Sequence, residues 1–186
     1  MMVKEMEIIQ KKLDRFFKEI QKEDFLKMRG LGNEVPYFVF DYNPEYELMV
    51  RNSVKYFADK MQVNVKVLNL FDMIIDLFED IGGIEGLKQF EEEQGTEELF
   101  EAILPTLEEE QLVERIGEEA TDAQMVFVTG VGSVFQLVST HELLNQLHAR
   151  VTNTPIIIFY PGKYTGQGLS LFNRFESNGY YRAFSI

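Results

Sequence analysis

The sequence contains no cysteine and no tryptophan among its 186 residues, and it has only two histidines. Without cysteine the chain forms no disulfide, holds no zinc through thiolates and has no thiolate nucleophile. No apolar run approaches the roughly 18 residues that a membrane-spanning helix requires. The first residues alternate charged with apolar side chains and lack the apolar core of a secretion signal. We therefore expect a cytoplasmic protein with no membrane association.

Positive charge is also scarce, because 18 Lys and Arg oppose 31 Asp and Glu, which gives a net charge of −13. The imbalance is concentrated between Asp72 and Asp122, where Lys88 and Arg115 are the only basic residues. Binding to nucleic acid needs a concentrated basic surface, so we expect no direct nucleic-acid binding. Such an acidic stretch is typical of solvated helices. A surface that meets a basic partner, or imitates DNA, remains the alternative.

The sequence does contain a regular alternation of apolar strands and amphipathic helices, in a chain that is 45% hydrophobic. Such alternation favours right-handed crossovers and a mainly parallel, five-stranded sheet covered on both faces. We therefore expect an α/β fold with three layers, in a single domain over residues 1–186. The predicted strands are 36–41, 63–67, 124–129, 155–160 and 180–184. The predicted helices that alternate with these strands are 2–22, 43–61, 72–81, 139–150 and 168–177.

Two helical segments are special within this pattern. Residues 1–28 form an N-terminal helical segment with an apolar stripe that suits the domain's own sheet or a partner helix. Residues 84–120 are predicted as an acidic helical insertion after the second strand, interrupted near Gly95 and at Pro105. With that insertion, the order of strands resembles a P-loop NTPase core without a Walker motif. The chain has carboxylates, at Asp41–Glu45, where the phosphate loop would be.

Candidate binding residues follow the predicted strands, where α/β proteins usually place their ligands. Asp41 ends the first strand, and Gly130 and Gly132 follow the third. The fourth strand leads into a glycine-rich loop, in which Lys163 and nearby backbone donors are suited to an anion. A loop shaped only by aromatic packing remains the alternative. The candidates in and beside this loop are Tyr160, Gly162, Lys163, Tyr164 and Gln167.

The motifs that would assign a reaction are all incomplete. Gly162-Lys163 is followed by Tyr164, where a phosphate loop has serine or threonine. The Gly130–Gly132 turn has Phe135 at the position of the third glycine of a dinucleotide site. The helix that starts at His141 has Asn145 in place of the second histidine of a zinc protease. We therefore expect no metal, no cofactor and no catalytic residues, and hence not an enzyme.

Several segments together identify a family. Residues 30–36 run into 37–45 as Gly-Leu-Gly-Asn-Glu-Val-Pro and Tyr-Phe-Val-Phe-Asp-Tyr-Asn-Pro-Glu. The later segments, in the same order as in the family, are 130–132, 139–147, 160–167 and 180–184. This combination resembles the BrxB family of the BREX (bacteriophage exclusion) systems, and the resemblance covers essentially the whole chain.

The resemblance implies a small, non-catalytic component of a phage-defence complex. It also implies association with other BREX components, above all a PglZ-like protein of the alkaline-phosphatase superfamily. The family has no established catalytic residues to place on this sequence, and the oligomeric state stays open. A nucleotide or anion sensor at the sheet's carboxyl edge, using Asp41, Gly130–Ser133 and Lys163, is the alternative function.

Overall fold

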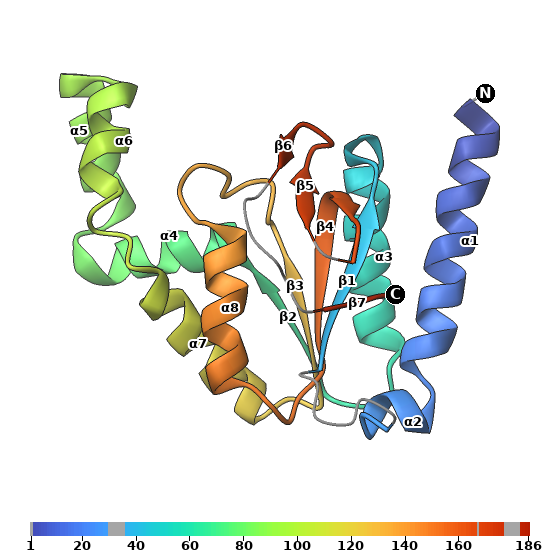
Figure 1. Cartoon of the computed structure of the whole chain (residues 1–186). Helices are drawn as coiled ribbons and strands as arrows, with labels where there is room; N and C mark the ends of the chain where they lie inside the picture. The colour runs from blue at the N-terminus through green and yellow to red at the C-terminus, as the bar shows by residue number, and fades with distance from the viewer. Residues whose placement is uncertain (1, 30–35, 167, 177–182) are drawn as a thin grey trace.

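The structure of the protein is a computed structural model that describes residues 2–29, 36–166, 168–176 and 183–186. Within these residues a sheet of mainly parallel strands has helices on both faces (Figure 1), which confirms the predicted α/β class. The sheet of the described residues has seven strands where five were predicted, because an antiparallel hairpin adds to the parallel strands. Its parallel strands stand in the order β2-β3-β4-β1-β7. Their bounds are β1 (Tyr37–Tyr42), β2 (Val65–Asn69), β3 (Met125–Thr129), β4 (Ile156–Tyr164) and β7 (Phe184–Ser185).

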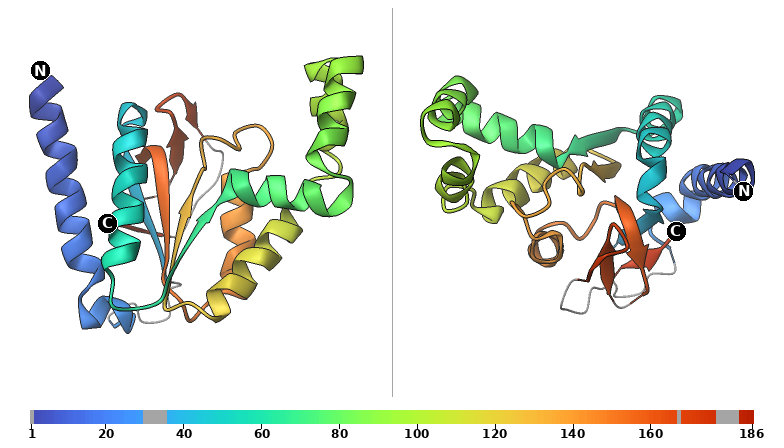
Figure 2. Two further views of the ribbon diagram at one scale, coloured as in Figure 1. Left: turned by 180° about the vertical axis from the view of Figure 1, so that it is seen from behind. Right: turned by 90° about the horizontal axis from the view of Figure 1, so that it is seen from above.

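One face of the sheet is covered by α1 (Met2–Ile20) and α3 (Glu47–Lys60), as the two views in Figure 2 show. The ring of Phe16 is central to this layer, because its centroid lies 5.0 Å from that of Phe40 and 5.5 Å from that of Phe159. The buried part of the α1 stripe is Ile9, Leu13, Phe16 and Ile20. The stripe therefore packs on the protein's own sheet, and α2 (Glu23–Leu26) follows it.

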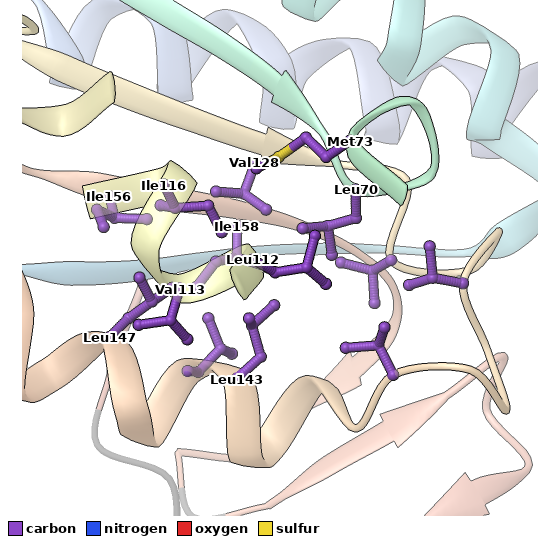
Figure 3. Packing of buried hydrophobic residues seen from close by; sticks show 14 of the residues in the cluster. Leu70, Met73, Leu112, Val113, Ile116, Val128, Leu143, Leu147, Ile156 and Ile158 are labelled. Carbon is purple, nitrogen blue, oxygen red and sulfur yellow. The ribbon is translucent and has the colours of Figure 1, made fainter. Parts of the chain in front are cut away.

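The opposite face is covered by α4 (Leu70–Ile81), α7 (Glu109–Thr121) and α8 (Thr140–Arg150). Figure 3 shows how α7 and α8 place branched apolar side chains against β4. Ile156 and Ile158 of β4 have no exposed surface, so this packing excludes water completely there. The helix residues labelled in this layer are Leu70, Met73, Leu112, Val113, Ile116, Leu143 and Leu147.

The acidic segment 84–120 contains three helices, α5 (Ile84–Gln94), α6 (Thr96–Ile103) and α7. The break at Gly95 has a positive φ of 98°, which glycine adopts readily. In Figures 1 and 2, α5 and α6 project away from the sheet, whereas α7 lies against it. Of the three helices in this segment, α5 and α6 therefore lie away from the sheet and α7 is part of its covering layer. That the segment is an insertion, that the core resembles a P-loop NTPase, and that residues 1–186 are one domain stay predictions.

The starts of two helices follow their sequence signals. The side chain of Asn43 accepts a hydrogen bond from the N–H of Glu45, 3.3 Å away, and η1 (Pro44–Tyr46) leads from there into α3. Ser139 caps α8 in the same way, because its Oγ accepts from the N–H of Glu142 at 3.3 Å. Short polar side chains at these positions satisfy backbone donors that the helix itself leaves unpaired.

The predicted helix over 168–177 is wrong. The chain instead forms β5 (Leu169–Leu171) and β6 (Phe175–Glu176), which pair with each other in antiparallel fashion. Leu169 and Leu171 are buried, while Ser170 between them is more exposed, which is the alternation of a strand. Residue 177 lies outside the described residues.

The prediction that β4 ends at Tyr160 is also wrong, because the strand continues to Tyr164 and pairs there with β5. Pro161 lacks an N–H and is normally excluded from a central strand. It is tolerated here because β3 pairs with β4 only as far as Ile158, so no β3 carbonyl opposes the proline. Of the predicted last strand, 180–182 lie outside the described residues, and Phe184 pairs with Phe38 of β1.

Candidate functional site

The carboxyl ends of the parallel strands form the natural ligand position of this sheet. β1 leads to α3 on one face and β3 leads to α8 on the other, with β4 between them. Open α/β sheets usually bind ligands in the crevice at such a change of direction. In this protein β4 runs on past the edge, and the hairpin of β5 and β6 folds back beside it (Figure 1).

Asp41, near the end of β1, is held by two other parts of the chain. Its carboxylate forms an ion pair with the ammonium of Lys12 on α1. Its Oδ2 accepts a hydrogen bond from the backbone N–H of Tyr164, 3.1 Å away. The Asp41 side chain is only 20% exposed. Asp41 therefore fastens α1 and the extension of β4 to β1, and both of its oxygens are engaged in this task.

The three candidate glycines are required by close packing. A Cβ on Gly162 would lie 2.1 Å from the backbone oxygen of Ser170 in β5, and one on Gly132 would lie 2.8 Å from the Phe172 ring. Gly130 has a positive φ of 79°, and its added Cβ would lie 2.3 Å from Oδ1 of Asn69. Real side chains do not fit at such distances. Gly132 lets the β3 turn approach the hairpin, Gly162 lets β5 approach β4, and Gly130 lets the same turn approach Asn69.

The remaining candidates divide into buried and exposed residues. Tyr160 is buried, and burial raises the pKa of its hydroxyl above the usual value of 10.0. Tyr164 is also buried, and its hydroxyl donates to the carbonyl of Ala183 at 2.8 Å. Lys163, between Pro161-Gly162 and Tyr164 in β4, is exposed to solvent. Gln167 lies outside the described residues.

A hollow of about 300 Å³ opens at this edge between the turn after β3, the start of α8 and the hairpin. Phe135 and Phe175 both line it, and their rings contact each other at a tilt of 34°, with centroids 4.5 Å apart. Tyr160 is the sequence-predicted residue that reaches it. The lining residues that sequence reasoning missed include Phe135, Gln136, His141, Leu169, Leu171 and Phe175. The alternation of Leu169 and Leu171 with Ser170 was the available signal for a short strand here, but it does not specify the turn of the hairpin.

The start of α8 beside this hollow carries an unexpected contact. The N–H of Ser139 donates to Oε1 of Glu109 on α7, 2.9 Å away. Burial raises the pKa of Glu109 above its usual 4.5, the Ser139 N–H lowers it, and the nearby charge of Glu142 raises it again. His141 begins the incomplete zinc motif, and Asn145 stands in place of its second histidine. Nε2 of His141 lies 3.0 Å from Nδ2 of Asn145.

The described candidate residues at this edge of the sheet therefore form contacts within the protein or exposed surface, and they do not form a set of reactive groups. The charged candidate Asp41 is neutralised by Lys12, and Gly132 allows the β3 turn to lie against the hairpin. The exposed candidate is Lys163, and the hollow beside it is lined by the half-buried Phe135 and by Phe175, which is 48% exposed. None of the helices in the described part of the chain combines the length and the apolar character needed to cross a bilayer.

Comparison with known proteins gives one consistent result. The family model described as "BREX protein BrxB" matches residues 66–186. The "BREX protein BrxB" of Bacillus cereus (strain H3081.97) is 31% identical over 186 residues, which cover 96% of this chain and 97% of that protein. The protein of the same name from Escherichia coli O9:H4 (strain HS) is 34% identical over 183 residues, covering 96% and 92%. No solved structure matches the chain.

Proposed function

The chain belongs to the BrxB family of BREX systems, and from this premise we propose that it is a non-catalytic adaptor of a BREX phage-defence complex. It acts in the cytoplasm with other BREX components. Its partner is a PglZ-like protein of the alkaline-phosphatase superfamily, which the adaptor holds in the assembly. Phage defence itself follows from the family, whereas the adaptor role and the identity of the partner are the proposal.

The engagement of Asp41 is the observation that carries this proposal. A carboxylate that acts as a general base, or that binds a metal, needs a free oxygen directed at its substrate. Both oxygens of Asp41 are used inside the fold, one by Lys12 and one by Tyr164. The hairpin of β5 and β6 pairs with the extension of β4 at this edge and forms one wall of the hollow there. These contacts favour a structural role for the sheet edge and a binding role for its outer surface.

Co-purification from the native operon tests the proposal. A tagged copy of this protein is expressed with its neighbouring genes and recovered at physiological salt. We expect the PglZ-like protein to be retained in a fixed ratio, and a tagged, unrelated acidic protein of similar size to retain none. Consistent recovery of this protein alone would sink the adaptor role. A deletion strain should also lose phage resistance, and a plasmid copy should restore it.

The alternative function, a nucleotide or anion sensor, rests on the exposed ammonium of Lys163 at the same edge. Calorimetry with ATP, GTP and inorganic phosphate separates the two functions. The adaptor role predicts no heat of binding at millimolar ligand. Saturable heat that disappears in Lys163→Met would establish the sensor.

A further inference from the structure

The outer edge of β2 is the feature of the fold that the function above leaves unused. β2 stands at one end of the strand order and pairs with β3 along its whole length, from Val65 opposite Met125 to Asn69 opposite Thr129. No strand of the described residues pairs with its other side. Edge strands present unpaired N–H and C=O groups, which other chains readily use for pairing.

The backbone direction of β2 can be assigned residue by residue. Asn64, just before the strand, directs both backbone groups towards β3: its carbonyl accepts from the Gln124 N–H at 2.8 Å and its N–H donates to the Gln124 side chain at 3.1 Å. Successive residues of a strand point to alternate sides. The N–H and C=O of Val65 and Val67 therefore point outward, away from β3.

This outer edge opens into a hollow of about 730 Å³. The hollow is lined by residues of α3, which covers one face of the sheet, and by residues of α4 and α7, which cover the other. Figure 2 shows β2 at the edge of the sheet, between these helices. Val67 lies within the hollow and is 40% exposed. Helices on both sides thus leave a slot beside the second half of the strand, Val67–Asn69. An extended peptide has the shape that fits such a slot.

The two walls of the slot differ in charge. The α3 wall carries Arg51 and Lys55, and Arg51 is paired with Glu47 at 3.1 Å. No described residue pairs with Lys55. The opposite wall carries Asp72 and Asp76 from α4, and Arg115, Glu118 and Glu119 from α7.

Several charges of that second wall are neutralised within the protein. Arg115 is paired with Asp80 and lies 4.0 Å from Asp76, and Glu119 is paired with Lys66 at 2.8 Å. No described residue pairs with Asp72 or Glu118. One wall therefore offers an unpaired ammonium and the other offers unpaired carboxylates.

We propose that the outer edge of β2 is a docking site for an extended segment of a partner protein, which adds to the sheet as a further strand. Its side chains alternate between the two faces. Those directed at α3 are acidic, to meet Lys55, and those directed at α4 and α7 are basic, to meet Asp72 and Glu118. This inference rests on the proposed adaptor function, since it names the surface and the chemistry by which a partner is held.

Val67→Pro tests the backbone part of the docking site. Because the Val67 N–H points outward, proline removes a donor needed by the added strand and no bond to β3. We expect the partner recovered in co-purification to fall about tenfold or more. The matched control, Val67→Thr, keeps the N–H and the strand propensity and should recover the partner as the wild type does. A thermal melt of each variant reports whether the fold is intact.

Charge reversal on the two walls gives a second measurement that does not depend on proline. Lys55→Glu and Asp72→Lys should each lower partner recovery, and more so at low salt. Lys60→Glu is the control for the first, since it makes the same change on α3 outside the hollow. In the wild-type complex, hydrogen exchange of the backbone amides of Val65 and Val67 should slow relative to the protein alone.

The outcomes separate this inference from the adaptor role. If wild-type protein recovers its partner and both Val67→Pro and the charge reversals recover it equally, the β2 site is wrong and the adaptor role stands. If wild-type protein recovers no partner, the adaptor role itself fails. If purified wild-type protein is a dimer that Val67→Pro converts to a monomer, the edge pairs two copies of this chain, and the proposal of a separate partner is overturned.

Discussion

The N–H of Ser139 and the carboxylate of Glu109 are 2.9 Å apart, so a side chain from α7 satisfies the first backbone donor of the α8 cap. The spacing of Ser139 and Glu142 in the sequence suggests a capping box, in which Glu142 would reach back to this N–H. The structure forms half of that box: Ser139 Oγ accepts from the N–H of Glu142, while Glu109 takes the role of the returning carboxylate. The cap therefore joins two helices that are distant in the sequence.

The raised pKa of Glu109 gives this cap a pH dependence. A carboxyl whose pKa is higher in the folded state binds its proton more tightly there, so its contribution to stability declines as pH rises above the usual value of 4.5. As pH increases through this range, wild type should lose stability while Glu109→Gln should not, because glutamine keeps an acceptor without the charge. The free energy of unfolding of Glu109→Gln should therefore rise relative to that of wild type. Urea unfolding at a series of pH values measures the difference.

Glu109→Ala serves as the control for the cap itself, since it removes the acceptor at every pH. It should cost about 1 kcal/mol, as the loss of a helix cap usually does. A difference between Glu109→Gln and wild type that stays constant from acid to neutral pH would contradict the assignment.

The ion pair between Lys12 and Asp41 should stabilise the attachment of α1. Lys12→Met leaves a largely buried carboxylate without its cation, and we expect a loss of about 1–2 kcal/mol. Asp41→Asn keeps an acceptor for the Tyr164 N–H. The two changes together should show a coupling energy of about 1 kcal/mol in a double-mutant cycle. Lys18→Met, at an exposed position of the same helix, is the control and should have no such coupling to Asp41→Asn. Strict additivity of the Lys12 and Asp41 changes would rule out the ion pair.

Gly162→Ala tests the packing of the hairpin against β4. The added Cβ meets the backbone of Ser170 at 2.1 Å, which cannot move without breaking the β4–β5 pairing. We expect a loss of about 2 kcal/mol or more in the free energy of unfolding. For Gly168→Ala the nearest atom is 3.8 Å away, so this change should stay within about 0.5 kcal/mol. Equal melting temperatures for the two variants would show that the hairpin does not pack as described.

Phe16→Ala should be the most damaging substitution in α1. The ring is 2% exposed and contacts the rings of Phe40 and Phe159, so its removal leaves a cavity and should cost about 4 kcal/mol. Met6 belongs to the same apolar stripe but is 49% exposed, and Met6→Ala should cost less than about 1 kcal/mol. Similar losses for both would mean that α1 is anchored along its whole length.

The middle of the sheet was predictable because β1, β3 and β4 are apolar on both faces. Residues 37–40, 125–128 and 156–160 are continuous buried runs, and only a sheet covered by helices buries such runs completely. The start of α8 was predictable for a local reason, since Ser139 lies three residues before Glu142. In both cases the signal lies within one segment of the chain.

The hairpin of β5 and β6 could not be derived in the same way. Its turn places Phe172 and Asn173 at positive φ values of 53° and 58°, and such a conformation is unusual for phenylalanine. The conformation persists because the Phe172 ring packs against Gly132, 40 positions earlier in the chain. A local pattern contains no information about a contact over that separation.

The candidate site failed to be predictable for a related reason. Asp41 and Lys163 both lie near the carboxyl edge of the sheet, as their positions after strands suggest. Those positions do not show which groups of the protein bind the Asp41 carboxylate. Lys12, which pairs with Asp41, lies on α1, and α2 separates α1 from β1 in the chain. The binding roles of the candidate residues stay predictions.

The position of β4 also decides the order in which the chain can assemble during synthesis. Ile156 pairs with both Tyr37 of β1 and Val126 of β3, so the middle of the sheet is the last of these strands to leave the ribosome. At usual elongation rates β1 is exposed for on the order of ten seconds before its neighbour exists. β3 already has β2 to pair with at that stage, whereas both neighbours of β1 are still missing, so any protein that shelters nascent chains has its longest-lived target at β1.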